Sequence, residues 1–132
     1  MVRKRRSSKR RLSAKTADKY VLYTEAVQSP EGEVAFFKGV YRKENGRPPI
    51  VLREDFCGTA AICCEWVKKG AQNQSIGVDL DPEPLAWGKE HYMSKLNADQ
   101  KRRVQLRRAN VLSVKTPLVD VIAALNLSLI HI

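Results

Sequence analysis

The chain of 132 residues has few cysteines, no long apolar run and almost no acidic residues at its N-terminal end. No apolar stretch approaches the roughly 18 residues of a membrane-spanning helix, so we expect no membrane association. Its three cysteines, Cys57, Cys63 and Cys64, have no disulfide-framework spacing, which argues against a secreted, disulfide-stabilised protein. They also lack a C-x-x-C pair or a nearby histidine, so no metal site is expected. An intracellular compartment, cytoplasmic or nuclear, fits this cysteine usage.

The shortage of acids is confined to one segment. Residues 1–19 have nine basic side chains and one acid, which accounts for +8 of the formal net charge of +10. Because such a segment repels itself and has little to bury, we expect a disordered basic tail. Three interpretations stay open: residues 3–19 bind nucleic acid, they form a nuclear-import signal, or the tail is a solvated leader without a specific partner. Five further bases, which either extend such a surface or form a solvated edge, are Lys101, Arg102, Arg103, Arg107 and Arg108.

Residues 20–48 predict a helical lead-in. Ser29 and Pro30 have the types preferred at a helix N-cap and at the first helical position. Apolar residues then recur at helical spacing. Asn45 and Gly46, followed by two prolines, predict the end of this helix and a turn.

Residues 49–126 alternate between strand and helix patterns. Strands are expected over residues 50–52, 75–79, 104–106 and 119–125, with helices over 60–69 and from Pro82 to Leu96. Asp81 is a suitable N-cap for the second of these helices. Repeated βαβ units predict a Rossmann-like, doubly wound parallel sheet with helices on both faces.

In a sheet of this kind, ligands bind outside the carboxyl ends of the strands. Glu54 and Asp55 end the first strand, and burying them requires a partner, either Arg53 or a ligand carrying an ammonium group. Gly58 lets the backbone approach a ligand closely. Asp79 lies 21 residues later at the tip of the second strand, where a carboxylate accepts hydrogen bonds from both ribose hydroxyls.

The turn after the first strand lacks the G-x-G-x-x-G pattern that holds a pyrophosphate. Its single glycine is Gly58, and the acids Glu54 and Asp55 would repel phosphate. A dinucleotide ligand is therefore disfavoured, and an amino acid joined to a nucleoside suits these residues better.

Two motifs carry a resemblance to a known family. VLREDFCGTA (residues 51–60) and GVDLDP (residues 77–82) resemble the cofactor-binding motifs of class I S-adenosylmethionine-dependent methyltransferases. More narrowly, EDFCGTA with GVDLDPEPLAWG (residues 77–88) is similar to a mostly bacterial group of these enzymes. The resemblance covers residues 20–126 and implies a methyltransferase that binds S-adenosylmethionine and an unidentified methyl acceptor.

The resemblance also implies roles for single residues. Phe56, Gly58 and Ala60 stand at the three glycines of the family's acidic-x-Gly-x-Gly-x-Gly motif, which leaves its usual turn geometry open. No catalytic base is implied, because the sulfonium is already activated and catalysis is mainly positioning. The implied cofactor contacts are Glu54 to the methionine ammonium, Gly58 by its backbone, Asp79 to the ribose, Leu80 and Asn110 to adenine, and Asn126 near the transferred methyl group.

The family's sheet usually has seven strands, and the pattern here predicts a sheet truncated after about four. Residues 127–132 match what a common sequencing-adaptor end encodes, so we predict a non-native end there. A partial domain of this kind is expected to be inactive alone. The alternative function is a non-catalytic nucleic-acid-binding protein that uses the basic tail on the same fold.

Overall fold

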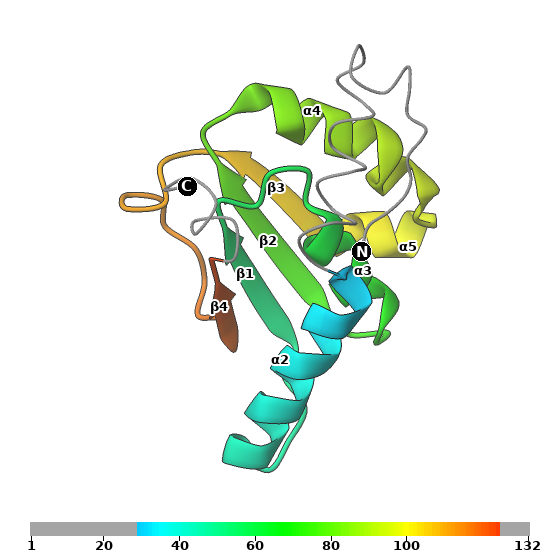
Figure 1. Ribbon diagram of the computed structural model, residues 1–132, viewed down its shortest axis with the longest axis vertical. Helices are drawn as coiled ribbons and strands as arrows, with labels where there is room; N and C mark the ends of the chain where they lie inside the picture. The colour runs from blue at the N-terminus through cyan, green and yellow to red at the C-terminus, as the bar shows by residue number, and fades with distance from the viewer. Residues whose placement is uncertain (1–28, 125–132) are drawn as a thin grey trace, which may run out of the picture.

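The computed structural model describes residues 29–124, and Figure 1 shows their arrangement. The predictions for the basic tail, for Asn126 and for residues 127–132 lie outside the described residues. So does the first part of the helical lead-in, residues 20–28. In the described part, no helix is both long and apolar enough to cross a membrane.

The predicted helix of the lead-in is confirmed as α2 (Pro30–Asn45). The Ser29 hydroxyl oxygen accepts the Gly32 N–H at 3.3 Å, as expected of an N-cap. Gly46 ends the helix in the left-handed region (φ 72°), and its N–H donates to the Arg42 carbonyl. Local sequence chemistry is therefore enough to place both ends of α2.

Four parallel strands form a single sheet in the order β3-β2-β1-β4. They are β1 (Val51–Asp55), β2 (Gln74–Asp79), β3 (Val104–Arg108) and β4 (Val121–Ala123). The chain moves outward from β1 through β2 to β3 and then returns to the other side of β1. This order confirms the doubly wound sheet and puts its switch point between β1 and β4.

Helices connect the first three strands. Helix α3 (Ala61–Lys68) joins β1 to β2, and α4 (Pro82–His91) begins after β2 with Asp81 as its N-cap. The Asp81 carboxylate accepts the Glu83 N–H at 3.0 Å, as its position predicts. In Figure 1, α4 starts at the upper edge of the sheet, where β2 ends.

The prediction that α4 continues to Leu96 is wrong. The helix ends at His91 and is followed by a 3-10 turn, η3 (Met93–Lys95), and a short helix, α5 (Ala98–Arg102). Asn97 and Gln100 form a capping box, in which each side chain accepts the other residue's backbone N–H. This reciprocal pair starts a new helix where the apolar spacing alone suggested a continuation.

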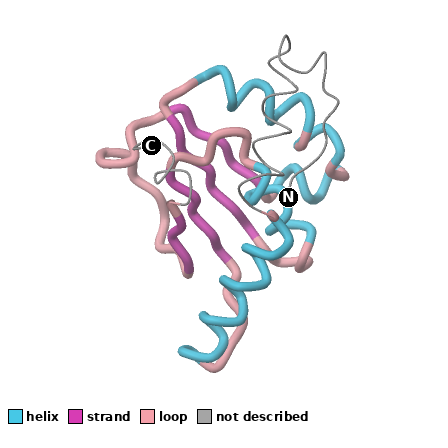
Figure 2. The backbone as a smooth tube through the Cα atoms, in the orientation of Figure 1, coloured by secondary structure: helices cyan, strands magenta, loops and turns pink. Residues whose placement is uncertain are grey.

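The segment between β3 and β4 contains no helix, as Figure 2 shows. Among residues 29–124 the prediction of helices on both faces is therefore wrong, since the face away from α3 is contacted by this loop through Val111 and Thr116. β4 covers only Val121–Ala123 of the predicted 119–125, and Ala124 already lies outside the strand. Asp120, just before β4, contacts the start of β1. Its N–H donates to the Val51 carbonyl at 2.8 Å, and its carboxylate accepts the N–H groups of Ile50 and Val51. Leu125 lies outside the described residues.

The main core lies on the face of the sheet that α3 covers. Leu52 and Glu54 point to this face, while Arg53 and Asp55 point to the other. Trp66 is fully buried in α3 and donates its indole N–H to the Ile50 carbonyl at 2.9 Å. The other large core members are Val34, Ile62, Val67, Leu85 and Leu96.

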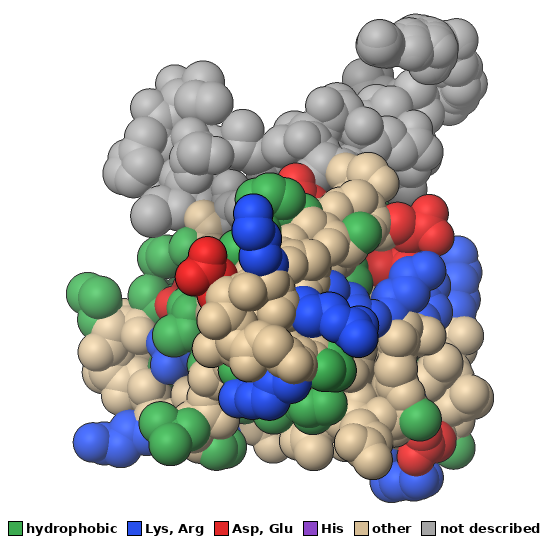
Figure 3. Space-filling model, turned by 90° about the horizontal axis from the view of Figure 1, so that it is seen from below, with side chains coloured by type: hydrophobic (Ala, Val, Ile, Leu, Met, Phe, Trp, Pro, Cys, Tyr) green, Lys and Arg blue, Asp and Glu red, His purple; other side chains and the backbone are tan. Residues whose placement is uncertain are grey.

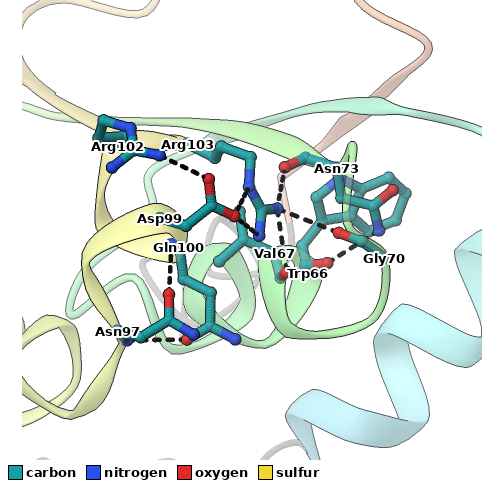
Figure 4. Close-up of polar contacts among 9 residues, drawn as sticks. All are labelled: Trp66, Val67, Gly70, Asn73, Asn97, Asp99, Gln100, Arg102 and Arg103. Carbon is teal, nitrogen blue, oxygen red and sulfur yellow. Dashed lines mark hydrogen bonds and ion pairs between the residues drawn. The ribbon is translucent and has the colours of Figure 1, made fainter.

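Arg103 fastens the start of β3 to the end of α3 (Figure 4). Its Nη1 donates to the carbonyl oxygens of Val67, Gly70 and Asn73, at 3.1, 3.1 and 2.6 Å. The Nε of Arg103 donates to Asp99 at 3.1 Å. Of the five bases that flank β3, this one therefore has a structural role.

Figure 3 views the molecule from the edge at which the strands begin. On this face the Lys and Arg side chains lie in several separate groups among hydrophobic and acidic side chains. The basic residues seen there do not form one continuous field.

Candidate functional site

The turn between β1 and α3, residues 56–60, has an unusual backbone. Phe56, Gly58 and Ala60 all have left-handed φ angles, of 57°, 60° and 64°. Only Gly adopts this region without a steric cost, which is about 1–2 kcal/mol for other residues. These are the three positions that match the family's glycines. The left-handed geometry is thus present although two of the three residues have a Cβ.

Contacts with β2 and α4 fix this turn. The Cys57 N–H donates to the Val78 carbonyl at 3.0 Å, and the Gly58 N–H donates to Asp79 Oδ2 at 2.8 Å. From the other side, Gly88 of α4 lies against the backbone of Thr59, so closely that a Cβ at residue 88 would overlap the Thr59 carbonyl. Sequence reasoning gave Gly88 no role, because the contact depends on how α4 packs.

Glu54 is 1% exposed, at the end of a central strand. Its Oε1 accepts a hydrogen bond from the Cys63 thiol, with an Sγ–Oε1 distance of 3.4 Å. Burial raises the pKa of Glu54 to about 8, and the nearby carboxylates of Asp79 and Asp55 act in the same direction, whereas the Cys63 hydrogen bond lowers it. The carboxyl group is therefore mostly protonated at neutral pH.

Arg53 pairs with only one of the two acids that end β1. Its Nε lies 2.7 Å from Asp55 Oδ1, and its two other nitrogens donate to the Val111 carbonyl and the Thr116 hydroxyl. Glu54 receives none of these bonds, because alternate residues of a strand point to opposite faces. The expectation of an Arg53 partner is thus correct for Asp55 and wrong for Glu54.

The three cysteines are all free and buried. For Cys63 and Cys64 this confirms the expected small buried side chains. The pKa of Cys63 is raised well above its ordinary value by burial and by Glu54.

Gly77 makes room for two of the thiols, since a Cβ there would lie 2.9 Å from Cys57 Sγ and 3.1 Å from Cys63 Sγ. The bond from Cys63 to Glu54 was missed, and its only sequence signal is that helix α3 begins seven residues after Glu54. Among residues 29–124, no group of His, Cys, Asp or Glu is placed to hold a metal ion.

Asp79 lies at the tip of β2 with both carboxylate oxygens engaged. Oδ2 accepts the Gly58 N–H at 2.8 Å and Oδ1 accepts the Asp81 N–H at 3.0 Å. Each oxygen keeps a second lone pair, so the carboxylate is able to accept further hydrogen bonds. The next residue, Leu80, leaves 59% of its surface exposed at the same edge.

Asn110 follows β3 close to Asp79, because the Ala109 N–H donates to the Asp79 carbonyl at 3.0 Å. Its exposed side chain accepts the Leu112 N–H at 2.8 Å through Oδ1. The structure therefore brings five of the six predicted residues to one edge of the sheet: Glu54, Gly58, Asp79, Leu80 and Asn110. Asn126 lies outside the described residues.

No protein-family profile and no curated protein matches the chain. Among solved structures, the plantazolicin methyltransferase BpumL, in complex with SAH, matches 89% of this chain and 41% of its own at 16% identity, with a TM-score of 0.59. SAM-bound CalS10, an amino pentose methyltransferase from Micromonospora echinaspora involved in calicheamicin biosynthesis, covers 81% of this chain and 41% of its own at 18% identity, with a TM-score of 0.60.

A third similar structure is the glycopeptide N-methyltransferase MtfA complexed with sinefungin. It covers 78% of this chain and 39% of its own at 15% identity, with a TM-score of 0.57. The chain thus spans about two fifths of the length of these proteins. This likeness shows that the described residues have the parallel α/β fold that these methyltransferase structures share.

Proposed function

We propose that this chain binds S-adenosylmethionine at the carboxyl edge of its sheet and forms the cofactor-binding part of a class I methyltransferase. Residues 49–126 would be the cofactor-binding domain, with residues 20–48 as its helical lead-in. The acceptor of the methyl group is not assigned, because the chain spans only part of the length of the methyltransferases whose fold it shares.

The observation that carries this proposal is the conformation of the turn. Three left-handed residues alternate along residues 56–60, and Gly58 is bonded directly to Asp79 on the neighbouring strand. A left-handed φ angle at a residue other than glycine strains the backbone and persists only where neighbouring contacts hold it. Strained residues of this kind cluster at binding sites. The turn also presents backbone without a side chain at Gly58, where a ligand would approach between β1 and β2.

The nucleoside half of the ligand would lie against β2 and β3. Asp79 has lone pairs left for the two ribose hydroxyls, and the exposed Leu80 offers an apolar surface to the base. Asn110 lies next to them through the bond between Ala109 and Asp79. Its carbonyl oxygen, already bonded to the Leu112 N–H, has a second lone pair for the exocyclic amine of adenine.

The methionine half would lie over the end of β1. Glu54 supplies a carboxyl group there, and the carboxylates of Asp55 and Asp79 are close enough to affect its pKa. This concentration of acids disfavours a phosphate and suits an ammonium group. When bound, S-adenosylmethionine supplies an activated methyl group, so this chain's residues need to bind and orient it rather than act as a base.

Calorimetric titration with S-adenosylmethionine tests the proposal. The chain is expected to bind it, and Asp79→Ala is expected to weaken binding at least tenfold, because each hydrogen bond to a charged group contributes about 1.5–3 kcal/mol. Asp99→Ala is the matched control, since Asp99 lies at the opposite edge of the sheet beside Arg103. Its affinity should equal that of the unchanged chain.

Two results would contradict the proposal. One is the absence of binding by a chain that is shown to be folded by its circular dichroism. The other is an equal loss of affinity in Asp79→Ala and Asp99→Ala, which would indicate general destabilisation rather than a ligand contact.

A further inference from the structure

Glu54 has no cationic partner in the part of the chain that the structure describes. Its side chain is 1% exposed, and its hydrogen-bond donors are the thiol and the backbone N–H of Cys63. On the two flanking strands, the residues in register with Glu54 are Gly77 and Ala123, neither of which has a polar side chain. The guanidinium of the preceding residue, Arg53, is bonded to Asp55 on the other face of β1.

Among residues 29–124, the titratable groups whose charges act on Glu54 are all acids. Asp79 is on β2, Cys57 is in the turn, and Cys63 and Cys64 are on α3, while Asp55 acts from the other face of β1. A carboxylate buried among acids and neutral strand neighbours is strongly disfavoured, so the free protein keeps the proton on Glu54. A cation brought in by a ligand would reverse that preference.

We propose that a ligand with an ammonium group enters this site with release of one proton from the Glu54 carboxyl group to the solvent. In this step the carboxyl O–H bond breaks, the proton passes to the buffer, and the resulting carboxylate pairs with the ammonium ion. No electrons are exchanged and no further reactant is needed. This inference rests on the proposed S-adenosylmethionine site and adds that the ligand's affinity depends on pH through one residue.

The coupling also makes Glu54 a specificity-determining residue. A ligand that has the nucleoside but no ammonium group leaves the proton in place, so its affinity gains nothing from a rise in pH. A ligand with the ammonium group binds more tightly as the pH rises toward 8, by at most tenfold for each pH unit, because the proton it displaces is progressively easier to lose.

The test is calorimetric titration at pH 6.5 in two buffers with different heats of ionisation that both work at this pH, such as phosphate and Bis-Tris. At this pH the amino group of S-adenosylmethionine is protonated, since α-amino groups titrate near pH 8. The expected result is release of close to one proton per S-adenosylmethionine bound, and of none with 5′-methylthioadenosine, which lacks the amino acid. Binding of S-adenosylmethionine without proton release would overturn the inference and leave the proposed function standing.

Two variants identify the group that loses the proton. Glu54→Gln keeps the shape of the protonated side chain but has no proton to lose, so it is expected to bind S-adenosylmethionine more weakly and without proton release. Asp99→Asn, an acid-to-amide control on α5 away from the site, should keep the release. Proton release that persists in Glu54→Gln would overturn the assignment, and absence of binding by both ligands would overturn this inference and the proposed function together.

Discussion

At the scale of single residues, the candidate site depends on three glycines, which have no Cβ, as much as on its polar side chains. Gly58 permits a left-handed turn, Gly77 leaves space for two thiols, and Gly88 lets α4 touch the backbone of Thr59. At Gly77 and Gly88 a neighbouring atom occupies the space that a Cβ would need. Gly58 has a left-handed φ angle, which residues with a Cβ adopt only at a steric cost. All three lie in the quoted motifs, but only the role of Gly58 is predicted from the sequence, because the roles of the other two depend on which elements pack together.

Gly88→Ala is expected to lower the free energy of unfolding by about 1–3 kcal/mol, the usual range for overpacking. The added Cβ overlaps the Thr59 carbonyl, which cannot move without disturbing the turn. This loss outweighs the gain of about 1 kcal/mol that alanine normally brings to a helix interior. Urea unfolding followed by circular dichroism measures the change.

Gly39→Ala is the control for this prediction. Gly39 lies in α2 with nothing within 4 Å of an added Cβ, so this variant is expected to be as stable as the unchanged chain or more stable by up to about 1 kcal/mol. Equal effects of the two substitutions would show that packing of α4 against the turn is not tight.

At the scale of elements, the helix ends follow local chemistry and the connections do not. Ser29, Gly46 and Asp81 act as the caps that their types predict. The break after His91 depends on the capping box at Asn97, which a prediction based on apolar spacing overlooked. The join between α3 and β3 depends on Arg103, whose partners lie 30 to 36 residues away in the sequence.

Arg103→Lys is expected to lower the free energy of unfolding by about 2–4 kcal/mol. A lysine cannot reproduce the planar set of donors that reaches Val67, Gly70 and Asn73. The carbonyl oxygens of these residues would therefore lose hydrogen bonds from a charged donor. Arg102→Lys serves as the control, because the Arg102 side chain is 70% exposed and its ion pair with Asp99 contributes little. Thermal melting of both variants checks the difference, and a similar loss in the two would contradict the role of Arg103.

At the scale of the whole molecule, Asp120 ties distant parts of the chain together. Its carboxylate accepts the Ile50 and Val51 N–H groups at 2.7 and 3.0 Å and the Tyr41 hydroxyl at 3.1 Å, with Arg47 3.6 Å away. It thereby joins the end of α2, the start of β1 and the start of β4. Burial alone would raise the pKa of Asp120, but these hydrogen bonds and Arg47 lower it below its ordinary value of 3.8.

A lowered pKa in the folded state stabilises the protein above the pKa of the unfolded state. This stabilisation is lost as the pH falls below 3.8 and through the lower native pKa. Asp120→Asn removes the ionisable group, so its stability relative to the unchanged chain should be lowest near neutral pH and should recover partly near pH 3. Urea unfolding at pH 7 and pH 3 measures this, and a stability difference that does not change with pH would contradict the prediction.

The sequence by itself determined the fold class, the caps of α2 and α4, and the residues that would line the carboxyl edge of the sheet. Those features follow from periodicity and from residues acting on their immediate neighbours. The tertiary structure decided which acid Arg53 neutralises, how Glu54 meets Cys63, and why Gly77 and Gly88 are needed. These contacts join elements whose relative placement no local pattern encodes, since they depend on strand alternation and on how the helices pack against the sheet.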